Sequence, residues 1–392
     1  MTELQSTLIL LIKSALTGEP YRLPAGTDLA EVFQVAKYHG VDVIAYYGGL
    51  LCGVDKRHPV MQEETLRVYS SISVSETQLS AIRKIKDALE VHGVAHMPLK
   101  GVHLKKMYPH TEMRRMGDAD ILIDCSKYEI VRGFMQEFGY TEKYESDHEI
   151  VWSKKTVTIE FHKRLIPSYN KDYYQYFGDG WKLARPLEGY TCRYRMNPED
   201  EMIYLFTHFA KHYRDSGIGI RHIVDLWVYR KHNPKLDETY IRKELQKLQL
   251  LEFYDNITRT LRVWFENCPQ DEKTEYITQF IFTSGEFGRS HISNLSSALK
   301  YAQNGQSEQS IKRRRALRTI FPTYAEMSIK YKVLRKWPIL LPVMWLVRIY
   351  RKVFIKKRAQ RFIDRQKNVN ISKISEYQQS LNYVGLDFHF SE

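Results

Sequence analysis

The sequence predicts an α+β fold in which a small α/β core lies between helical regions. Apolar residues recur at helical spacing through the first 92 residues and again beyond residue 198. Between about 94 and 165 the pattern changes to short apolar runs and strict alternation, which are typical of strands. At 392 residues the chain is long enough for two or three domains.

These changes of pattern divide the chain into four regions. The last boundary falls in the polar stretch 303–310. We expect an N-terminal helical region, a core, a second helical region that closes a cleft over the core, and a basic helical C-terminal region, with the bounds 1–92, 93–165, 166–302 and 303–392.

Helix signals are clearest outside the core. A long helical pattern covers residues 61–90, and Gly93 follows it as a stop signal. Asn197 before Pro198 predicts a second helix start, because proline is favoured at the first position of a helix. The stripe in the long helix consists of Ile72, Leu79, Ile82, Ile85 and Leu89.

Inside the core, one helix and one hairpin accompany the strands. Ser126 is the predicted N-cap of a helix that ends near Gly139. The segments 149–153 and 156–161 read as the two arms of a hairpin that turns around 154–155.

Two carboxylates precede the first clear strand of the core. Asp118 and Asp120 stand two residues apart, just before the apolar run 121–123. Side chains two apart in a strand point to the same face. Such carboxylates repel one another unless a cation lies between them, and Mg²⁺ is typically held by one or two carboxylates together with substrate phosphates.

A third carboxylate lies on a later strand. Residues 156–162 alternate polar and apolar side chains, which places Glu160 and His162 on one face. We therefore expect Glu160 to join Asp118 and Asp120 across neighbouring strands. Three carboxylates are enough to hold two metal ions for an in-line displacement at phosphorus.

A Lys-Gly turn precedes the carboxylates. Gly101 after Lys100 lets backbone N–H groups approach a phosphate, and the helix that follows adds its positive end. Arg114, four residues before Asp118, either clamps a triphosphate or pairs with Glu112, and the sequence leaves both interpretations open.

Together these motifs resemble the uncharacterised bacterial nucleotidyltransferases of the polymerase-β superfamily. The resemblance covers most of the chain, and its central motif is fairly specific. It rests on Leu99, Lys100, Gly101, Tyr108, Pro109, Arg114, Gly117, Asp118, Asp120, Glu160 and His162, and extends through His208, His212, Arg221 and Asp225 to Phe321, Pro322, Leu341 and Pro342.

The resemblance implies a polymerase-β-type core that transfers a nucleoside monophosphate from an NTP, with ATP as the expected donor, and releases pyrophosphate. The acceptor, a small molecule, RNA or protein, is not identified. Val102 stands where the superfamily has serine, and Glu160 where aspartate is usual. The expected catalytic and Mg²⁺-binding residues are Asp118, Asp120 and Glu160, and the expected nucleotide-binding residues are Lys100, Gly101, Arg114 and His162.

Two pairs with helical i, i+4 spacing follow the core. His208 and His212 share a face, but Phe209 replaces the glutamate of a zinc protease helix, so we expect them to line a cleft or to support the fold. Arg221 and Asp225 are most simply a helical ion pair, and a role in nucleotide binding is the alternative.

The C-terminal region is strongly basic. Residues 311–370 hold eighteen lysines and arginines against Glu326 and Asp364, so the rest of the chain is close to neutral. Such an arm suits a polyanion or an anionic membrane surface. Within residues 337–355 the uninterrupted apolar run is eleven residues long and contains two prolines, so it is too short to span a bilayer. The segment is expected to be a core helix or a helix lying on a membrane surface.

Cysteine spacing and the first residues bear on location. The four cysteines lie far apart, which fits a reducing cytoplasm, and the N-terminus reads as a helix rather than a signal peptide. We expect a cytoplasmic enzyme, with a peripheral position at the inner membrane surface as the alternative. Two other functions stay open: a nucleotide-dependent tRNA or protein modifier, and a non-catalytic scaffold or membrane-surface protein that retains the fold.

Overall fold

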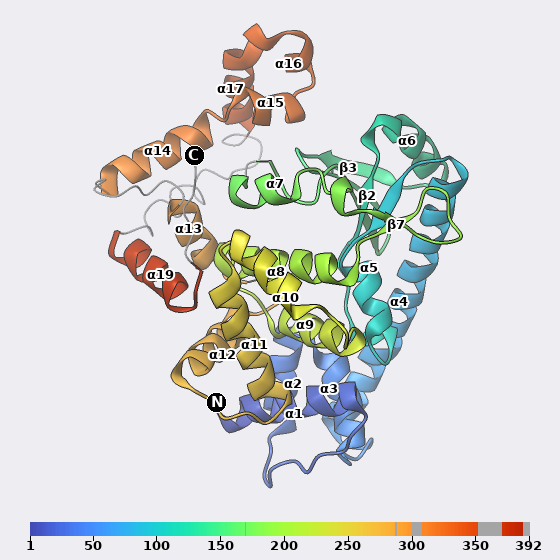
Figure 1. Ribbon diagram of the computed structural model, residues 1–392, viewed down its shortest axis with the longest axis vertical. Coiled ribbons are helices and arrows are strands. Elements are labelled where there is room, and N and C mark those ends of the chain that lie inside the picture. The colour runs from blue at the N-terminus through green and yellow to red at the C-terminus, as the bar shows by residue number, and fades with distance from the viewer. Residues whose placement is uncertain (169, 287, 300–307, 352–370, 387–392) are drawn as a thin grey trace.

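The computed structural model describes residues 1–168, 170–286, 288–299, 308–351 and 371–386 (Figure 1). The fold is α+β, as the sequence predicts, with a five-stranded sheet set among helices from both ends of the chain. In Figure 1 the long helix α4 runs along one side and connects the N-terminal helices to the sheet.

The N-terminal helices follow the predicted pattern. A capping box between Thr2 and Gln5 begins the first helix. The long helix has proline at its first position and ends before Gly93, whose φ of 65° suits glycine. The four helices are α1 (Glu3–Thr17), α2 (Leu29–Tyr38), α3 (Asp42–Leu51) and α4 (Pro59–Val91).

The sheet is mixed, with the strand order β1-β2-β5-β4-β3. The central strand β5 runs parallel to its neighbour β2, whereas the other neighbouring strands are antiparallel. Apolar side chains of α4 and α6 share one core with Ile121, Ile159 and Phe161, so these helices cover one face. The elements are β1 (His96–Pro98), α5 (Gly101–Leu104), β2 (Ala119–Ile123), α6 (Tyr128–Glu137), β3 (Thr141–Glu145), β4 (Glu149–Lys154) and β5 (Val157–His162).

The structure differs from two local predictions in the core. The prediction that Ser126 caps the helix is wrong, because the carboxylate of Asp124 accepts the N–H of Ser126 at 2.9 Å and a short 3₁₀ turn precedes α6. The hairpin of β4 and β5 is confirmed, but Lys154 pairs with Val157 within the ladder. The turn is therefore shifted by one residue, and Lys155 takes the positive φ (51°) that two-residue hairpins use.

A second helical body packs against the N-terminal helices. One apolar core joins Leu8 of α1, Phe206 of α8, Phe253 of α11 and Leu381 of α19. The predicted start at Asn197 is confirmed, since its side chain accepts the N–H of Asp200. The elements are α7 (Lys171–Phe177), β6 (Arg185–Pro186), β7 (Tyr194–Arg195), α8 (Pro198–Asp215), α9 (Ile220–His232), α10 (Glu238–Lys247), α11 (Leu251–Phe265), α12 (Glu272–Ser284), α13 (Ser290–Leu299) and α19 (Ile371–Tyr383).

The basic C-terminal region has two parts in space. Its last described helix, α19, packs into the helical body, whereas α15 to α17 form a separate group at the top of Figure 1. Residues 300–307 and 352–370, which hold much of the predicted polar stretch and of the basic arm, lie outside the described residues. Within the described ranges, no helix is both long and apolar enough to cross a membrane. The group follows α14 (Glu308–Ile320) and consists of α15 (Tyr324–Lys330), α16 (Val333–Lys336) and α17 (Leu341–Tyr350).

Candidate active site

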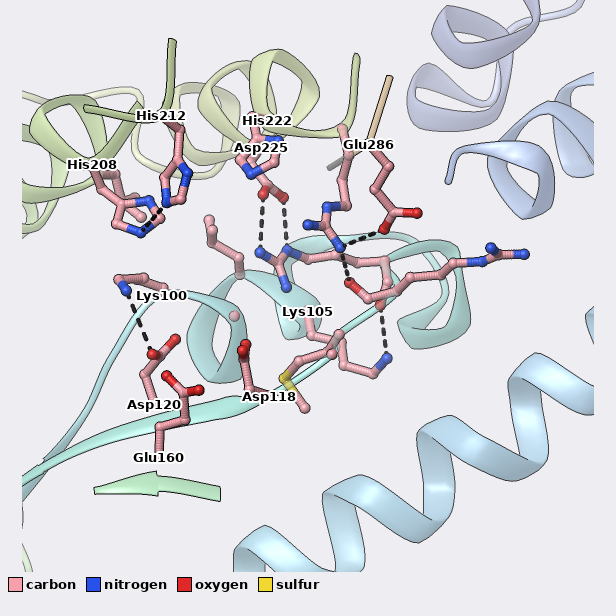
Figure 2. A pocket seen from close by; sticks show the side chains of 18 of the residues that line it. Lys100, Lys105, Asp118, Asp120, Glu160, His208, His212, His222, Asp225 and Glu286 are labelled. Carbon is pink, nitrogen blue, oxygen red and sulfur yellow. Dashed lines mark hydrogen bonds and ion pairs between the residues drawn. The ribbon is translucent and has the colours of Figure 1, made fainter. Parts of the chain in front are cut away.

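A cavity of ≈ 840 Å³ lies between the uncovered face of the sheet and the helices α8 and α9. Figure 2 shows its two walls. Asp118, Asp120 and Glu160 point into it from the sheet side, and His208 and His212 face it from α8. One wall is therefore acidic and the other carries imidazoles.

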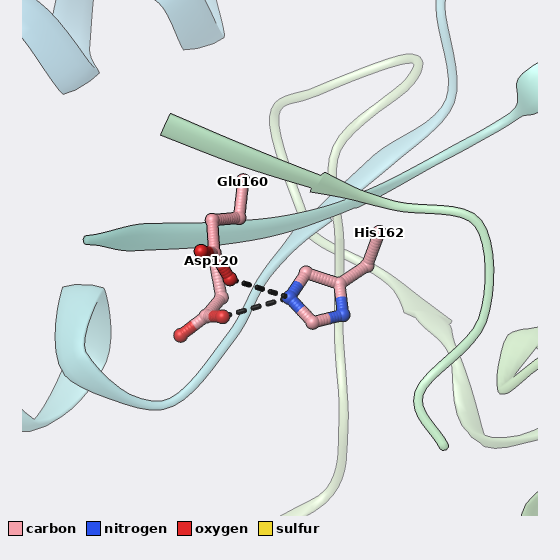
Figure 3. Close-up of side chains that lie close together, drawn as sticks. All are labelled: Asp120, Glu160 and His162. Atoms are coloured by element: carbon pink, nitrogen blue, oxygen red, sulfur yellow. Dashed lines mark hydrogen bonds and ion pairs between the residues drawn. The ribbon is translucent and has the colours of Figure 1, made fainter. Parts of the chain in front are cut away.

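The parallel pairing of β2 and β5 creates the acidic wall. Asp120 stands directly opposite Glu160 in the ladder, which confirms that the two carboxylates meet across neighbouring strands. Among the described residues, one group has potential metal-ligand atoms within 4.8 Å of one another: Asp120, Glu160 and His162 (Figure 3). Asp118 precedes β2 and contributes to the same cavity but lies outside this group.

Two cationic or donor groups hold Asp120. Nε2 of His162 lies 2.7 Å from Oδ1 of Asp120 and 3.8 Å from a carboxylate oxygen of Glu160. Nζ of Lys100 lies 3.5 Å from the same Oδ1. Burial alone would raise the pKa of Asp120, but Lys100 and His162 outweigh it and hold that pKa well below its ordinary value. Asp120 is therefore charged.

The charged forms of the other two carboxyl groups, Asp118 and Glu160, are disfavoured in this protein without a bound cation. Removal from water and the neighbouring charges of Asp118 and Asp120 raise the pKa of Glu160 to about 8. Desolvation and Asp120 likewise raise the pKa of Asp118. A divalent cation relieves this kind of repulsion, and carboxylate oxygens are the ligands that Mg²⁺ prefers. The donor set therefore fits a hard divalent metal ion.

The Lys-Gly turn has an unusual backbone. Lys100 has φ 41° and ψ −110°, a conformation that costs a residue with a side chain about 1–3 kcal/mol and persists where surrounding structure imposes it. This conformation directs Nζ toward Asp120 (Figure 2). The sequence predicts that the helix after this turn adds its positive end to a phosphate site. That helix, α5, is only a single turn of four residues.

Arg114 does not pair with Glu112. Its Nε and Nη2 donate to the two carboxylate oxygens of Asp225 at 2.7 and 2.9 Å, and Tyr108 donates to the same carboxylate at 2.7 Å. Glu112 instead accepts a hydrogen bond from Tyr47. The arginine lies directly behind the Lys-Gly turn, because a Cβ on Gly101 would come within 2.8 Å of its Nη1.

The predicted helical pair of Arg221 and Asp225 is wrong for the same reason. Asp225 forms its ion pair with Arg114. Nη1 of Arg221 instead lies 3.1 Å from Oε1 of Glu286 and donates a hydrogen bond to the carbonyl of Arg115 at 3.1 Å. Both partners come from other elements, at sequence separations that helical spacing does not reveal. The two residues nevertheless line the cavity, as do Glu286 and Lys211, which the sequence did not single out.

His208 and His212 line the cavity and contact each other. Their Nε2 atoms lie 3.0 Å apart, so one ring donates a hydrogen bond to the other. Burial, together with nearby Lys100 and Lys211, lowers both pKa values, to about 4 for His212. At neutral pH these rings are therefore uncharged hydrogen-bonding groups.

Comparison with known proteins agrees with this arrangement. The family model described as "uncharacterised nucleotidyltransferase" matches residues 25–266, more than half of the chain. The chain belongs to this nucleotidyltransferase family. The matched segment contains the whole sheet and both α8 and α9, and therefore both walls of the cavity. No curated protein and no solved structure gave a significant match.

Proposed function

We propose that this nucleotidyltransferase moves a nucleoside monophosphate from an NTP, with ATP as the expected donor, to an oxygen of the acceptor. The proposal rests chiefly on the register of β2 and β5, which sets Asp120 beside Glu160 in a cavity lined by basic and imidazole groups. Membership of the family supports a nucleotide as the substrate.

Asp118, Asp120 and Glu160 are the proposed ligands of two Mg²⁺ ions, which when bound neutralise the phosphates and orient them for in-line attack. His162 positions Asp120 through the 2.7 Å contact between Nε2 and Oδ1. If Nε2 carries the proton, it donates to the carboxylate and does not ligate a metal itself.

The transfer exchanges one oxygen for another at the α-phosphorus. The acceptor oxygen forms a bond to the α-phosphorus, the bond from that phosphorus to the bridging oxygen of the β-phosphate breaks, and pyrophosphate leaves with the bonding electrons. Glu160 receives the acceptor proton. Lys100 and the backbone of Gly101 bind the leaving phosphates, and Arg114 holds the turn in place through its position behind Gly101. Rate enhancement then comes from orientation and charge stabilisation.

Two radiolabels distinguish this reaction from its nearest alternative. We would incubate the full chain with Mg²⁺, cell extract and ATP labelled at either the α- or the γ-phosphate, and then separate small molecules, RNA and protein. Nucleotidyl transfer places the α-label in one fraction and the γ-label in pyrophosphate. Transfer of the γ-label to an acceptor would instead mean phosphoryl transfer and would contradict the proposal.

A matched pair of variants assigns the activity to the site. Asp120→Asn keeps the side-chain shape and removes a ligand charge, so it should abolish transfer. Asp55→Asn makes the same chemical change on an exposed side chain and should leave the rate unchanged. Equal rates in both variants would exclude the acidic wall as the site of transfer.

A further inference from the structure

The helix α17 is apolar yet has no buried residue. Ile339, just before it, is 83% exposed, and Leu346 is 67% exposed. With Val343 and Tyr350, also exposed, they recur at intervals of four, three and four residues, so they share one face of the helix. Trp337, 62% exposed, extends this apolar stripe at its N-terminal end.

The opposite side of α17 is anchored, which fixes the direction of the stripe. Nε1 of Trp345 donates to the carbonyl of Pro322 at 2.9 Å, and its ring lies edge-on against Phe321. Arg348 donates to the carbonyl of Thr319 at 2.6 Å. The helix therefore packs on its own group through one side and presents the apolar stripe to solvent on the other.

The segment that carries the stripe is strongly basic. Residues 308–351 hold eleven lysines and arginines against Glu308 and Glu326. Lys336 and Arg351, which flank the stripe at its two ends, are both exposed. A second copy of the chain would bring the same positive charge to the contact and would be repelled, whereas an anionic surface is attracted.

We propose that the stripe of α17 and its basic flanks dock the protein on an anionic lipid surface. Apolar and aromatic side chains on one face, with lysine and arginine beside them, are the features of a helix that lies in the membrane interface. RNA would use the positive charge but would gain little from isoleucine, valine and leucine, because single-stranded RNA is held by aromatic stacking and by contacts to phosphate. The exposed aliphatic side chains therefore favour lipid.

Ion pairs connect this surface to the catalytic sheet. Nζ of Lys163 lies 2.8 Å from Oε1 of Glu145 on β3. Lys163 directly follows β5, the strand that carries Glu160. The carboxylate of Glu145 also lies 3.5 Å from both Lys332 and Arg335 in the α15 to α17 group. Docking would thus set the edge of the sheet next to the lipid surface.

Co-sedimentation with vesicles tests the proposal on the full chain. The probes are vesicles of phosphatidylcholine alone and of phosphatidylcholine with phosphatidylglycerol. Ile339→Ser with Leu346→Ser removes the centre of the stripe and should lower partitioning to anionic vesicles at least about tenfold. Leu66→Ser with Val91→Ser, at sites that are 71% and 82% exposed on α4, is the matched control and should bind as wild type does.

A charge variant gives an independent reading. Lys336→Gln with Arg351→Gln should weaken binding to anionic vesicles about fivefold per residue, because each basic side chain near an anionic surface contributes roughly that factor. Lys56→Gln with Lys235→Gln, also at exposed positions, should have no effect. Unchanged thermal unfolding shows that the variants fold.

Three results would overturn the proposal: no binding of wild type to anionic vesicles, equal binding to neutral and anionic vesicles, or full binding by the stripe variant. Salt-sensitive tRNA binding that survives loss of the stripe, without vesicle binding, would assign the basic surface to RNA instead.

Discussion

Because the ion pair of Arg114 and Asp225 is buried, breaking it should lower the free energy of unfolding far more than breaking an exposed pair of the same chemistry. Both side chains are 9% exposed, and two hydrogen bonds join them. Asp225→Asn keeps the shape but leaves the guanidinium without a counter-charge. Breaking a buried pair by removing one partner costs about 3–5 kcal/mol.

The chain supplies a matched control for this prediction. Arg242 and Asp255 form the same two-pronged pair, but their side chains are 45% and 41% exposed. Asp255→Asn should therefore cost about 0–1 kcal/mol, as exposed pairs do. Urea unfolding followed by circular dichroism gives both free energies of unfolding.

A second variant separates loss of one partner from loss of the pair. Replacing Arg114 by methionine together with Asp225 by leucine removes both charges, and such replacements are often neutral for stability. The double variant should thus be more stable than Asp225→Asn. Equal free energies of unfolding for Asp225→Asn and Asp255→Asn would show that burial does not make the loss of a counter-charge more costly.

Three further predictions concern pH, catalysis and the turn. Burial lowers the pKa values of His39 and His96 to about 4. As the pH is lowered, the unfolded chain therefore binds these protons before the folded chain does. The free energy of unfolding should then fall by up to about 1.4 kcal/mol per pH unit per histidine as the pH goes from 6.5 to 4. A free energy of unfolding that stays constant over this range in urea titrations would contradict the prediction. Glu160→Gln should lower kcat by roughly 10²-fold, with little change in nucleotide affinity measured by calorimetry; a parallel loss of affinity would make Glu160 a binding residue. Gly101→Ala should impair ATP binding, because its Cβ meets the guanidinium behind the turn, whereas Gly133→Ala, with nothing within 4 Å, should not.

Local periodicity predicted which side chains of the acidic wall share a face of the sheet. Alternation along β5 placed Glu160 and His162 on one face, and the ladder then set Glu160 opposite Asp120. The same reasoning gave the hairpin and the long helix, because each depends on neighbours in the chain. It did not show that the compact group of potential ligand atoms would consist of Asp120, Glu160 and His162, with Asp118 outside it.

The ion pairs between residues far apart in the sequence were not predicted. Arg114 and Asp225 are 111 residues apart, and Arg221 meets Glu286 from another segment. Helical spacing suggested a nearer partner for Asp225, and that inference failed because a buried carboxylate pairs with whichever cation the tertiary packing supplies. Only the folded arrangement determines such contacts.

The proposed function requires the acidic wall to bind metal ions for nucleotidyl transfer. Electron paramagnetic resonance with Mn²⁺ in place of Mg²⁺, in the presence of an ATP analogue that cannot be cleaved between its α- and β-phosphates, tests it without relying on turnover. We predict two bound Mn²⁺ per chain in wild type, and weakened binding in Asp120→Asn but not in Asp55→Asn. Identical Mn²⁺ binding by wild type and Asp120→Asn would exclude the acidic wall as the metal site.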